Sequence, residues 1–180
     1  MKNFILKFKF FYRLYQKLIR KNQNDYEFIK YIFSQSKKVN LLDLCCGDSF
    51  VLNYINDDVL NYIGIDNNEN YLKDSRLKYP NFKFINSDLE NIKKISDLEN
   101  NSIDFIFLNG AIHHLEDNIV IELFNFLDQK YPSAKYLTID PIRDENQFLN
   151  KMMINFDRGK FIRDHFGYKN IMEEFNFLIT

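Results

Sequence analysis

The chain has 180 residues, of which 46% are hydrophobic and 27% are charged. A chain of this size buries one α/β core and is too short for two independent ones. Its formal net charge of -1 argues against a surface devoted to nucleic acid, because nonspecific binding requires many Lys and Arg side chains to neutralise phosphates. We therefore expect one domain and no nucleic-acid partner, with any basic patch confined to part of the surface.

The cysteines and the apolar runs indicate the compartment. Cys45 and Cys46 are adjacent, and no secretory signal sequence precedes them. This pattern fits a reducing environment, so we expect a cytoplasmic protein. No apolar run reaches the roughly 18 residues that a membrane-spanning helix requires. Peripheral contact with a membrane is left open.

The N-terminal segment is predicted to form two helices. Apolar residues within 4–19 recur at helical spacing and define one face of an amphipathic helix, and no acidic residue precedes Asp25. A second helix is expected at about 24–36, with Ile29 and Phe33 on its buried face. The basic first helix fits a lid over an active site, which we favour, a helix that contacts a partner protein, or an anchor on anionic lipid. Packing on the core alone is the simplest alternative.

Beyond these helices, short apolar runs alternate with polar stretches that favour helix. The runs are mostly rich in β-branched or aromatic residues and are bounded by Asn, Asp, Gly or Pro. Strands are predicted at 39–45, 62–65, 82–85, 103–108 and 136–139. Helices are predicted between them at 50–55, 69–78 and 117–130. Such alternation favours parallel strands with right-handed crossovers, so we expect an α/β fold with a doubly wound, mostly parallel sheet.

Polar side chains collect where these strands end. The first strand leads into LLDLCCGDS, the second ends in GID, the third is followed by INSDL and the fourth by NGAIHHLED. In open parallel sheets, ligands bind at the carboxyl ends of the strands, near the point where the strand order reverses. Asp66, after the second strand, fits a ligand for ribose hydroxyls or a cap for the next helix. Asp88 fits a partner for an adenine amino group or a cap for a turn.

The loop after the first strand contains one glycine, Gly47, which permits a tight turn and close approach of a ligand. The loop lacks GxGxxG, so a dinucleotide pyrophosphate would lose the approach that those glycines allow, and a nicotinamide cofactor is disfavoured. S-adenosylmethionine (SAM) carries no phosphate and has a cationic end, which Asp43 is placed to hold. The alternative for Asp43 is a buried carboxylate satisfied by loop amides.

These segments, in this order, resemble the class I SAM-dependent methyltransferases, especially small bacterial members with a His-His pair after strand four. The resemblance covers roughly residues 39–168. LLDLCCGDS looks like the first motif, YIGIDNNENYL the second, FINSDL the third and IDFIFLNGAIHHLED the fourth, and TIDP and DRGKFIR extend the match. Accordingly, we expect residues 37–180 to form the SAM-binding core and residues 1–36 a helical lid or cap.

The resemblance assigns cofactor roles to six residues. Asp43 and Gly47 are expected to border the methionine part, Asp66 to hold the ribose, Asp88 and Leu89 to border adenine, and Asn109 to lie beside the methyl group. The implied reaction transfers a methyl group from SAM to a small-molecule acceptor, for which a sugar or a nucleotide-linked metabolite is one candidate. No metal site is predicted.

Other polar residues are candidates for the acceptor side. His113 and His114 follow the fourth strand, where a neutral His can take a proton from a hydroxyl acceptor. The alternative, for at least one of them, is a His bonded to backbone at the start of a helix. Asp140 and Arg143 are expected to orient a polar or anionic acceptor, or to form a loop ion pair. A basic cluster is expected on the solvated surface at Arg158, Lys160 and Arg163.

Two departures from the family pattern bear on function. Cys45 and Ser49 stand where the family usually has glycine, and a positive φ at either position would cost about 1 kcal/mol or more and weaken SAM binding. Family members usually continue through two further strands, whereas this sequence stops at FNFLIT, near where the sixth would begin. Either the sequence is a fragment, or a partner, a second copy or the N-terminal helix covers the sheet edge. The second function left open is a non-catalytic SAM-fold module that binds a partner.

Overall fold

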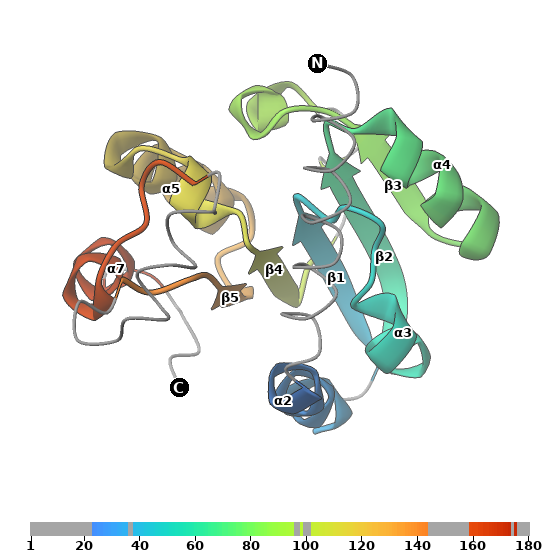
Figure 1. Ribbon diagram of the computed structural model, residues 1–180. Coiled ribbons are helices and arrows are strands. Elements are labelled where there is room, and N and C mark those ends of the chain that lie inside the picture. The colour runs from blue at the N-terminus through green and yellow to red at the C-terminus, as the bar shows by residue number, and fades with distance from the viewer. Residues whose placement is uncertain are drawn as a thin grey trace, which may run out of the picture.

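The computed structural model describes residues 23–35, 38–95, 98, 102–143, 159–173 and 175. Five strands form one sheet in which every pairing is parallel. The strands are β1 (Val39–Leu44), β2 (Val59–Asp66), β3 (Lys83–Asn86), β4 (Phe105–Asn109) and β5 (Lys135–Ile139). Their order in the sheet is β3-β2-β1-β4-β5 (Figure 1). The doubly wound α/β sheet predicted from the sequence is confirmed.

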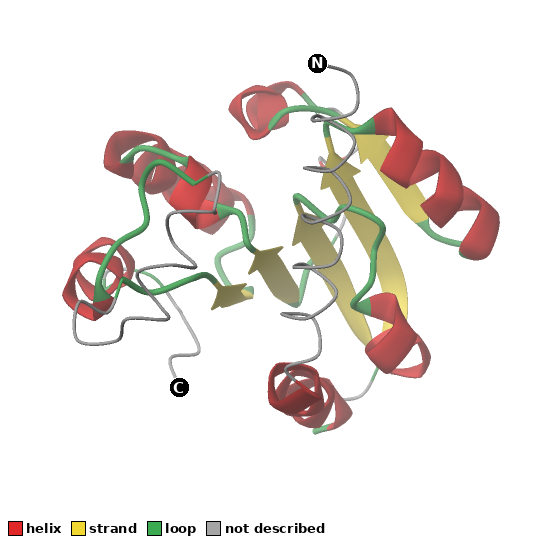
Figure 2. Ribbon diagram, viewed as in Figure 1, coloured by secondary structure: helices red, strands yellow, loops and turns green. Residues whose placement is uncertain are grey.

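Helices flank the strands on both sides (Figure 2). The α-helices are α2 (Gln23–Ser34), α3 (Leu52–Ile55), α4 (Glu69–Lys78), α5 (Asp117–Lys130) and α7 (His165–Met172). Short 3-10 helices are η1 (Asn56–Asp58), η2 (Leu89–Lys94) and η4 (Ile112–His114). The bounds of α4 and α5 agree with the predicted ones. The sequence analysis predicts no helix at α7, which has only 8 residues and carries Gly167 in its first turn.

Side chains along each strand alternate between two apolar layers. On β1, Leu42 and Leu44 contact the layer that includes α5 and α7, whereas Leu41 contacts the layer that includes α2, α3 and α4. Because β1 and β4 are buried on both faces, their sequences show long apolar runs without strict alternation. Asp43 lies two residues beyond Leu41 and therefore faces the α2–α4 layer.

The strand order reverses between β1 and β4. From β1 the chain builds outward through β2 to β3, and it then returns to add β4 and β5 on the other side. Asp43 of β1 pairs in register with Phe107 of β4. The loops after these two strands therefore flank the point at which open α/β sheets bind ligands.

Several predictions concern residues outside the described part of the chain. The basic helix expected at 4–19 and Arg158 lie there, and of the segment FNFLIT only Phe175 is described. Within the described residues, β5 is an edge strand of the sheet, and α2 packs Phe33 against Phe105 with ring centroids 4.9 Å apart. None of the described helices is long and apolar enough to cross a membrane.

Candidate functional site

The loop after β1 contains three residues in the left-handed region of the backbone map. Cys45, Gly47 and Ser49 have φ values of 58°, 55° and 54°. Glycine adopts this conformation freely, whereas the Cβ of other residues crowds the carbonyl at a cost of about 1 kcal/mol or more. Cys45 and Ser49 therefore both have the positive φ that the sequence analysis associates with backbone strain.

Hydrogen bonds hold this loop against the end of β2. The Gly47 N–H donates to Oδ2 of Asp66 at 2.9 Å, and the Asn68 N–H donates to Oδ1 at 2.8 Å. The Cys46 N–H donates to the Ile65 carbonyl at 3.0 Å. The N-cap of α4 is Asn68, whose side chain accepts from Asn70, so Asp66 is not the cap. Asp66 instead joins the loop after β1 to the start of α4.

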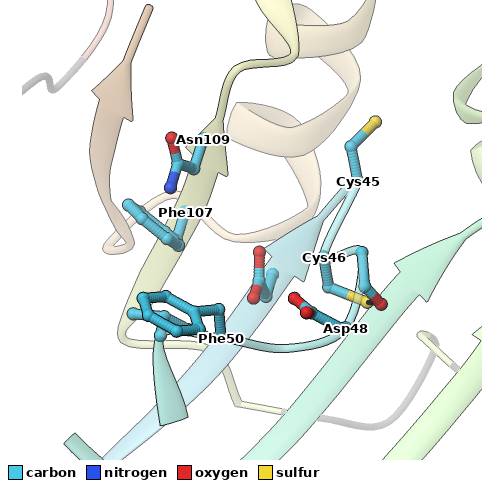
Figure 3. A pocket seen from close by; sticks show the side chains of 9 residues that line it. Cys45, Cys46, Asp48, Phe50, Phe107 and Asn109 are labelled. Carbon is cyan, nitrogen blue, oxygen red and sulfur yellow. Dashed lines mark hydrogen bonds between the residues drawn. The ribbon is translucent and has the colours of Figure 1, made fainter. Parts of the chain in front are cut away.

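A pocket of about 370 Å³, counted with its open mouth, lies against this loop. Its lining residues are Asp43, Cys45, Cys46, Gly47, Asp48, Phe50, Val51, Phe107 and Asn109. Figure 3 shows Phe107 and Asn109 along β4, across the pocket from the Cys45–Cys46 turn. Three of the residues predicted to bind the cofactor, Asp43, Gly47 and Asn109, thus share one pocket between β1 and β4. A Cβ added at Gly47 would meet nothing within 4 Å, so the backbone is open there.

Asp43 is the buried charge of this pocket. The residue is 2% exposed, and burial together with the smaller effect of the Asp66 carboxylate raises its pKa from 3.8 to about 7. A hydrogen bond from the Tyr62 hydroxyl, at 2.5 Å from Oδ2, acts in the opposite direction. The Asp43 carboxylate therefore accepts a hydrogen bond from the Tyr62 phenol on β2. The sequence analysis expected backbone amides of the loop as the alternative donors.

Both cysteine thiols have raised pKa values. Burial, followed by the Asp66 and Asp43 carboxylates, raises the pKa of Cys45 to about 12. Burial and the same two carboxylates raise the pKa of Cys46 further. Both are free thiols. A protonated thiol is a poor nucleophile, which agrees with the packing role preferred from the sequence.

Asp88 and Leu89 follow β3 and do not line the described pocket. The Asp88 carboxylate accepts a hydrogen bond of 2.7 Å from the Asn67 side chain. Leu89 begins η2 and packs against the layer that includes α5. The Ser87 N–H donates to the Asp66 carbonyl at 3.1 Å, which keeps the ends of β2 and β3 side by side. These two residues therefore lie along the same sheet edge, beyond Asp66.

The residues predicted for the acceptor side form a second cluster after β4 and β5. Nδ1 of His113 lies 2.6 Å from Oδ1 of Asp140, and both side chains are only 4% exposed. The His113 N–H donates to the same oxygen at 3.1 Å. The exposed His114 places its ring 4.1 Å from that of His113. Asp140 therefore pairs with His113, and the alternative ion pair with Arg143 is not the one that the structure shows.

Arg163 corrects an expectation from the sequence. The sequence predicts its side chain on the solvated surface, yet the side chain is only 9% exposed and forms a salt bridge of 2.5 Å with Asp117. Its guanidinium donates to the carbonyls of Ile112, Leu115 and Phe161 at 3.3, 2.8 and 2.9 Å. These contacts join residues up to 51 positions apart in the sequence. Local sequence patterns do not reveal them and therefore predict an exposed Arg163. Arg163 braces the loop after β4.

Comparison with known proteins agrees with this geometry. Residues 42–127 match the family model described as a methyltransferase domain. The structure is similar to the small RNA methyltransferase HEN1, with 16% identity, a TM-score of 0.69 and coverage of 84% of this chain and 21% of that one. This chain has the class I methyltransferase fold.

Two further structures share the methyltransferase fold. The plantazolicin methyltransferase BpumL, in complex with a triazolic desmethylPZN analog and SAH, has 19% identity, a TM-score of 0.62 and coverage of 83% of this chain and 61% of its own. A chain of the complex between the Haloferax volcanii Trm112 methyltransferase activator and a methyltransferase has 13% identity, a TM-score of 0.62 and coverage of 81% and 66%. The chain thus spans less than two thirds of the length of each of the three. No curated protein sequence matches the chain significantly.

The methyltransferase fold brings three residues to the site that motif comparison does not indicate. Phe50 and Phe107 form apolar walls of the pocket, and Tyr62 bonds to Asp43 from below the end of β2. Phe107 has the same strand parity as Asn109, which places both on one face of β4. The two-residue spacing of Phe107 and Asn109 is visible in the sequence, but it places Phe107 in the pocket only once the register of β4 beside β1 is known.

Proposed function

We propose that this protein is a SAM-dependent methyltransferase that acts on a small-molecule acceptor. The observation that carries the proposal is the pocket between β1 and β4, where the buried Asp43 carboxylate, the open backbone at Gly47 and the Asn109 side chain meet. This combination lies at the point of strand reversal, where the fold favours a ligand.

The residues of the pocket fit SAM better than a dinucleotide. Among the described residues that line it, none is basic, so a pyrophosphate would find no cationic side chain there. An ammonium group, by contrast, would find the Asp43 carboxylate. The Asp66 oxygens each accept one backbone N–H, and a carboxylate oxygen can accept a second donor such as a ribose hydroxyl.

We assign Asp43 and Gly47 to the methionine end of the cofactor and Asp66 to the ribose. Asp88 and Leu89, farther along the same edge, would border adenine, and Asn109 would lie beside the transferred group. Bound SAM supplies a methyl group on a good sulfonium leaving group. The remaining work of the protein is to align the acceptor and to exclude water, which the aromatic walls formed by Phe50 and Phe107 favour.

On the acceptor side we assign different roles to the two histidines. His113 is buried and held through Nδ1 by Asp140, so it acts as a positioning residue. His114 is exposed and rests against the His113 ring, so it is the better candidate to take a proton from an acceptor hydroxyl. Arg143 is exposed after β5 and is available to orient a polar or anionic acceptor.

Isothermal titration of the full chain with SAM, SAH and NADH tests the proposal. We expect saturable binding of SAM and SAH and none of NADH. Asp66→Ala should weaken SAM binding at least tenfold, because a hydrogen bond to a charged group contributes about 1.5–3 kcal/mol. Asp57→Ala, an exposed carboxylate in η1, is the matched control and should bind like the wild type.

Absence of SAM and SAH binding by the folded protein would contradict this function and would favour the non-catalytic module. The positive φ at Cys45 and Ser49 is the observation that supports the non-catalytic alternative, because backbone strain in this loop would weaken SAM binding. If SAM binds, an acceptor screen follows, in which His114→Ala should lower turnover while the affinity for SAM stays unchanged.

A further inference from the structure

Tyr62 and Asp43 form a fully buried pair beneath the pocket. Their residues are 1% and 2% exposed, and the phenol donates to Oδ2 of Asp43 at 2.5 Å. Tyr62 lies on β2 two residues before Gly64, which pairs in register with Asp43. Both side chains therefore project from the same face of the sheet, across the β1–β2 pair.

The glycine at position 64 makes room for this contact. A Cβ placed there would lie 2.8 Å from Cε1 of Tyr62 and 2.9 Å from Sγ of Cys46, closer than a Cβ atom approaches other heavy atoms in proteins. The phenol ring thus occupies the space above Gly64 on its way to the carboxylate. The pair depends on this specific strand geometry and is not an incidental contact between mobile side chains.

Four titratable groups lie near Asp43, and two of them, Tyr62 and Asp66, change its pKa. The Tyr62 phenol lowers its pKa, whereas burial and the Asp66 carboxylate raise it. The Cys45 and Cys46 thiols also lie nearby, and Asp43 contributes to their raised pKa values, so both stay neutral. Burial and the charge of Asp43 raise the pKa of Tyr62 well above 10. Tyr62 therefore keeps its proton and remains a hydrogen-bond donor throughout the neutral range.

We propose that Tyr62 is a positioning residue of the cofactor site, which holds the Asp43 carboxylate ionised toward the pocket and so sets the affinity for a ligand that carries an ammonium group. The inference rests on the proposed function, because the aminocarboxypropyl end of SAM or SAH provides that group. It adds a residue on β2 that does not line the described pocket.

The pair predicts how binding changes with pH. Near pH 7 about half of the Asp43 carboxyls are protonated in the free protein, since their pKa is about 7. An ammonium ligand favours the ionised form, so binding should release protons and should tighten as the pH rises through 7. Without the phenol, ionisation of Asp43 requires a higher pH, and binding at pH 7 should weaken.

The test compares two ligands on two Tyr→Phe variants. SAH carries the aminocarboxypropyl end, whereas 5′-methylthioadenosine lacks it. Tyr62→Phe removes the hydroxyl beneath the pocket. Tyr131→Phe is the matched control, because its phenol is also buried and donates to a carbonyl, that of Leu98 at 2.7 Å, outside the site. Affinities are measured by titration calorimetry on the full chain between pH 5.5 and 7.5.

We expect the wild type and Tyr131→Phe to bind SAH about tenfold more tightly at pH 7.5 than at pH 6, as a group of pKa 7 requires. Tyr62→Phe should bind SAH about tenfold more weakly than the wild type at pH 7, with its pH-dependent rise displaced upward. Affinity for 5′-methylthioadenosine should be the same in all three proteins and at every pH.

An unchanged SAH affinity and pH profile in Tyr62→Phe, with both ligands bound, would overturn this inference and leave the proposed function intact. If the folded wild type bound neither ligand, the proposed function itself would fail. Should Tyr62→Phe not fold, Asp43→Asn tests the step through which Tyr62 acts, because it keeps the shape of the side chain and removes its charge. A change in SAH affinity between pH 6 and 7.5 that persisted in Asp43→Asn would overturn the inference.

Discussion

The loops after β1 and β4 leave neighbouring strands at the same crevice, but they are held in different ways. The loop after β1 turns through its own left-handed residues and is tied to the adjacent strand by short hydrogen bonds. The loop after β4 is held by side chains far along the sequence, the Asp140 carboxylate and the Arg163 guanidinium. The first loop bears backbone strain locally, whereas the second depends on a distant brace.

Removal of the brace should have the largest effect. Arg163→Ala leaves three carbonyls and one carboxylate without their guanidinium partner, so we expect a loss of about 3 kcal/mol in the free energy of unfolding. Urea denaturation measures this loss. Hydrogen exchange should accelerate at residues 110–116 and stay unchanged at residues 45–51.

Lys160→Ala, an exposed cation on the same segment, is the control and should change neither measurement. Equal acceleration of exchange in both loops of Arg163→Ala would show that the two loops form one cooperative unit, against the contrast drawn here.

A smaller effect should come from the carboxylate at the base of the first loop. Folded Asp43 keeps its proton to about pH 7, whereas in the unfolded chain it is lost near pH 3.8. The unfolded state therefore binds fewer protons between these values, and stability falls as the pH rises. Between pH 5 and pH 7 this loss amounts to about 2 kcal/mol. The difference in unfolding free energy between wild type and Asp43→Asn should show it, and a difference independent of pH would refute it.

The smallest effect should come from relief of backbone strain. Cys45→Gly places glycine where φ is 58°, so we expect a gain of about 1 kcal/mol in thermal unfolding experiments, offset in part by the lost side-chain contacts. Ser49→Gly should gain less, because Ser49 is fully buried and its removal leaves a space. A loss of stability in Cys45→Gly would mean that the thiol's packing outweighs the strain.

The same contrast explains what could be predicted from the sequence. Of the six residues predicted for the cofactor, Asp43, Gly47 and Asn109 line one pocket. Asp43 and Asn109 lie on strands, and Gly47 lies just after one, whose apolar runs are visible in the local sequence. The bounds of α4 and α5 agree for the same reason. Periodicity along the chain carries this information.

Periodicity along the chain does not predict contacts between segments that are distant in the sequence. The Tyr62 phenol was read only as part of a strand, since its bond to Asp43 depends on the register of β1 and β2. For Asp140 the sequence offers a role in orienting the acceptor or an ion pair with Arg143, three residues away, whereas its observed partner His113 lies 27 residues earlier. The contacts of Arg163 with the loop after β4 could not be predicted, because they depend on where residues 159–164 pack against that loop.

The position of the brace also has a consequence for synthesis of the chain. Residues 39–66 supply the turn after β1, its Asp66 tie and the strand beside it, and they leave the ribosome early. The loop that carries His113 and His114 receives the Arg163 clamp only after residues 159–164 have emerged. The loop after β1 therefore has its local partners first, and the loop after β4 acquires its final shape only after residues 159–164 have emerged.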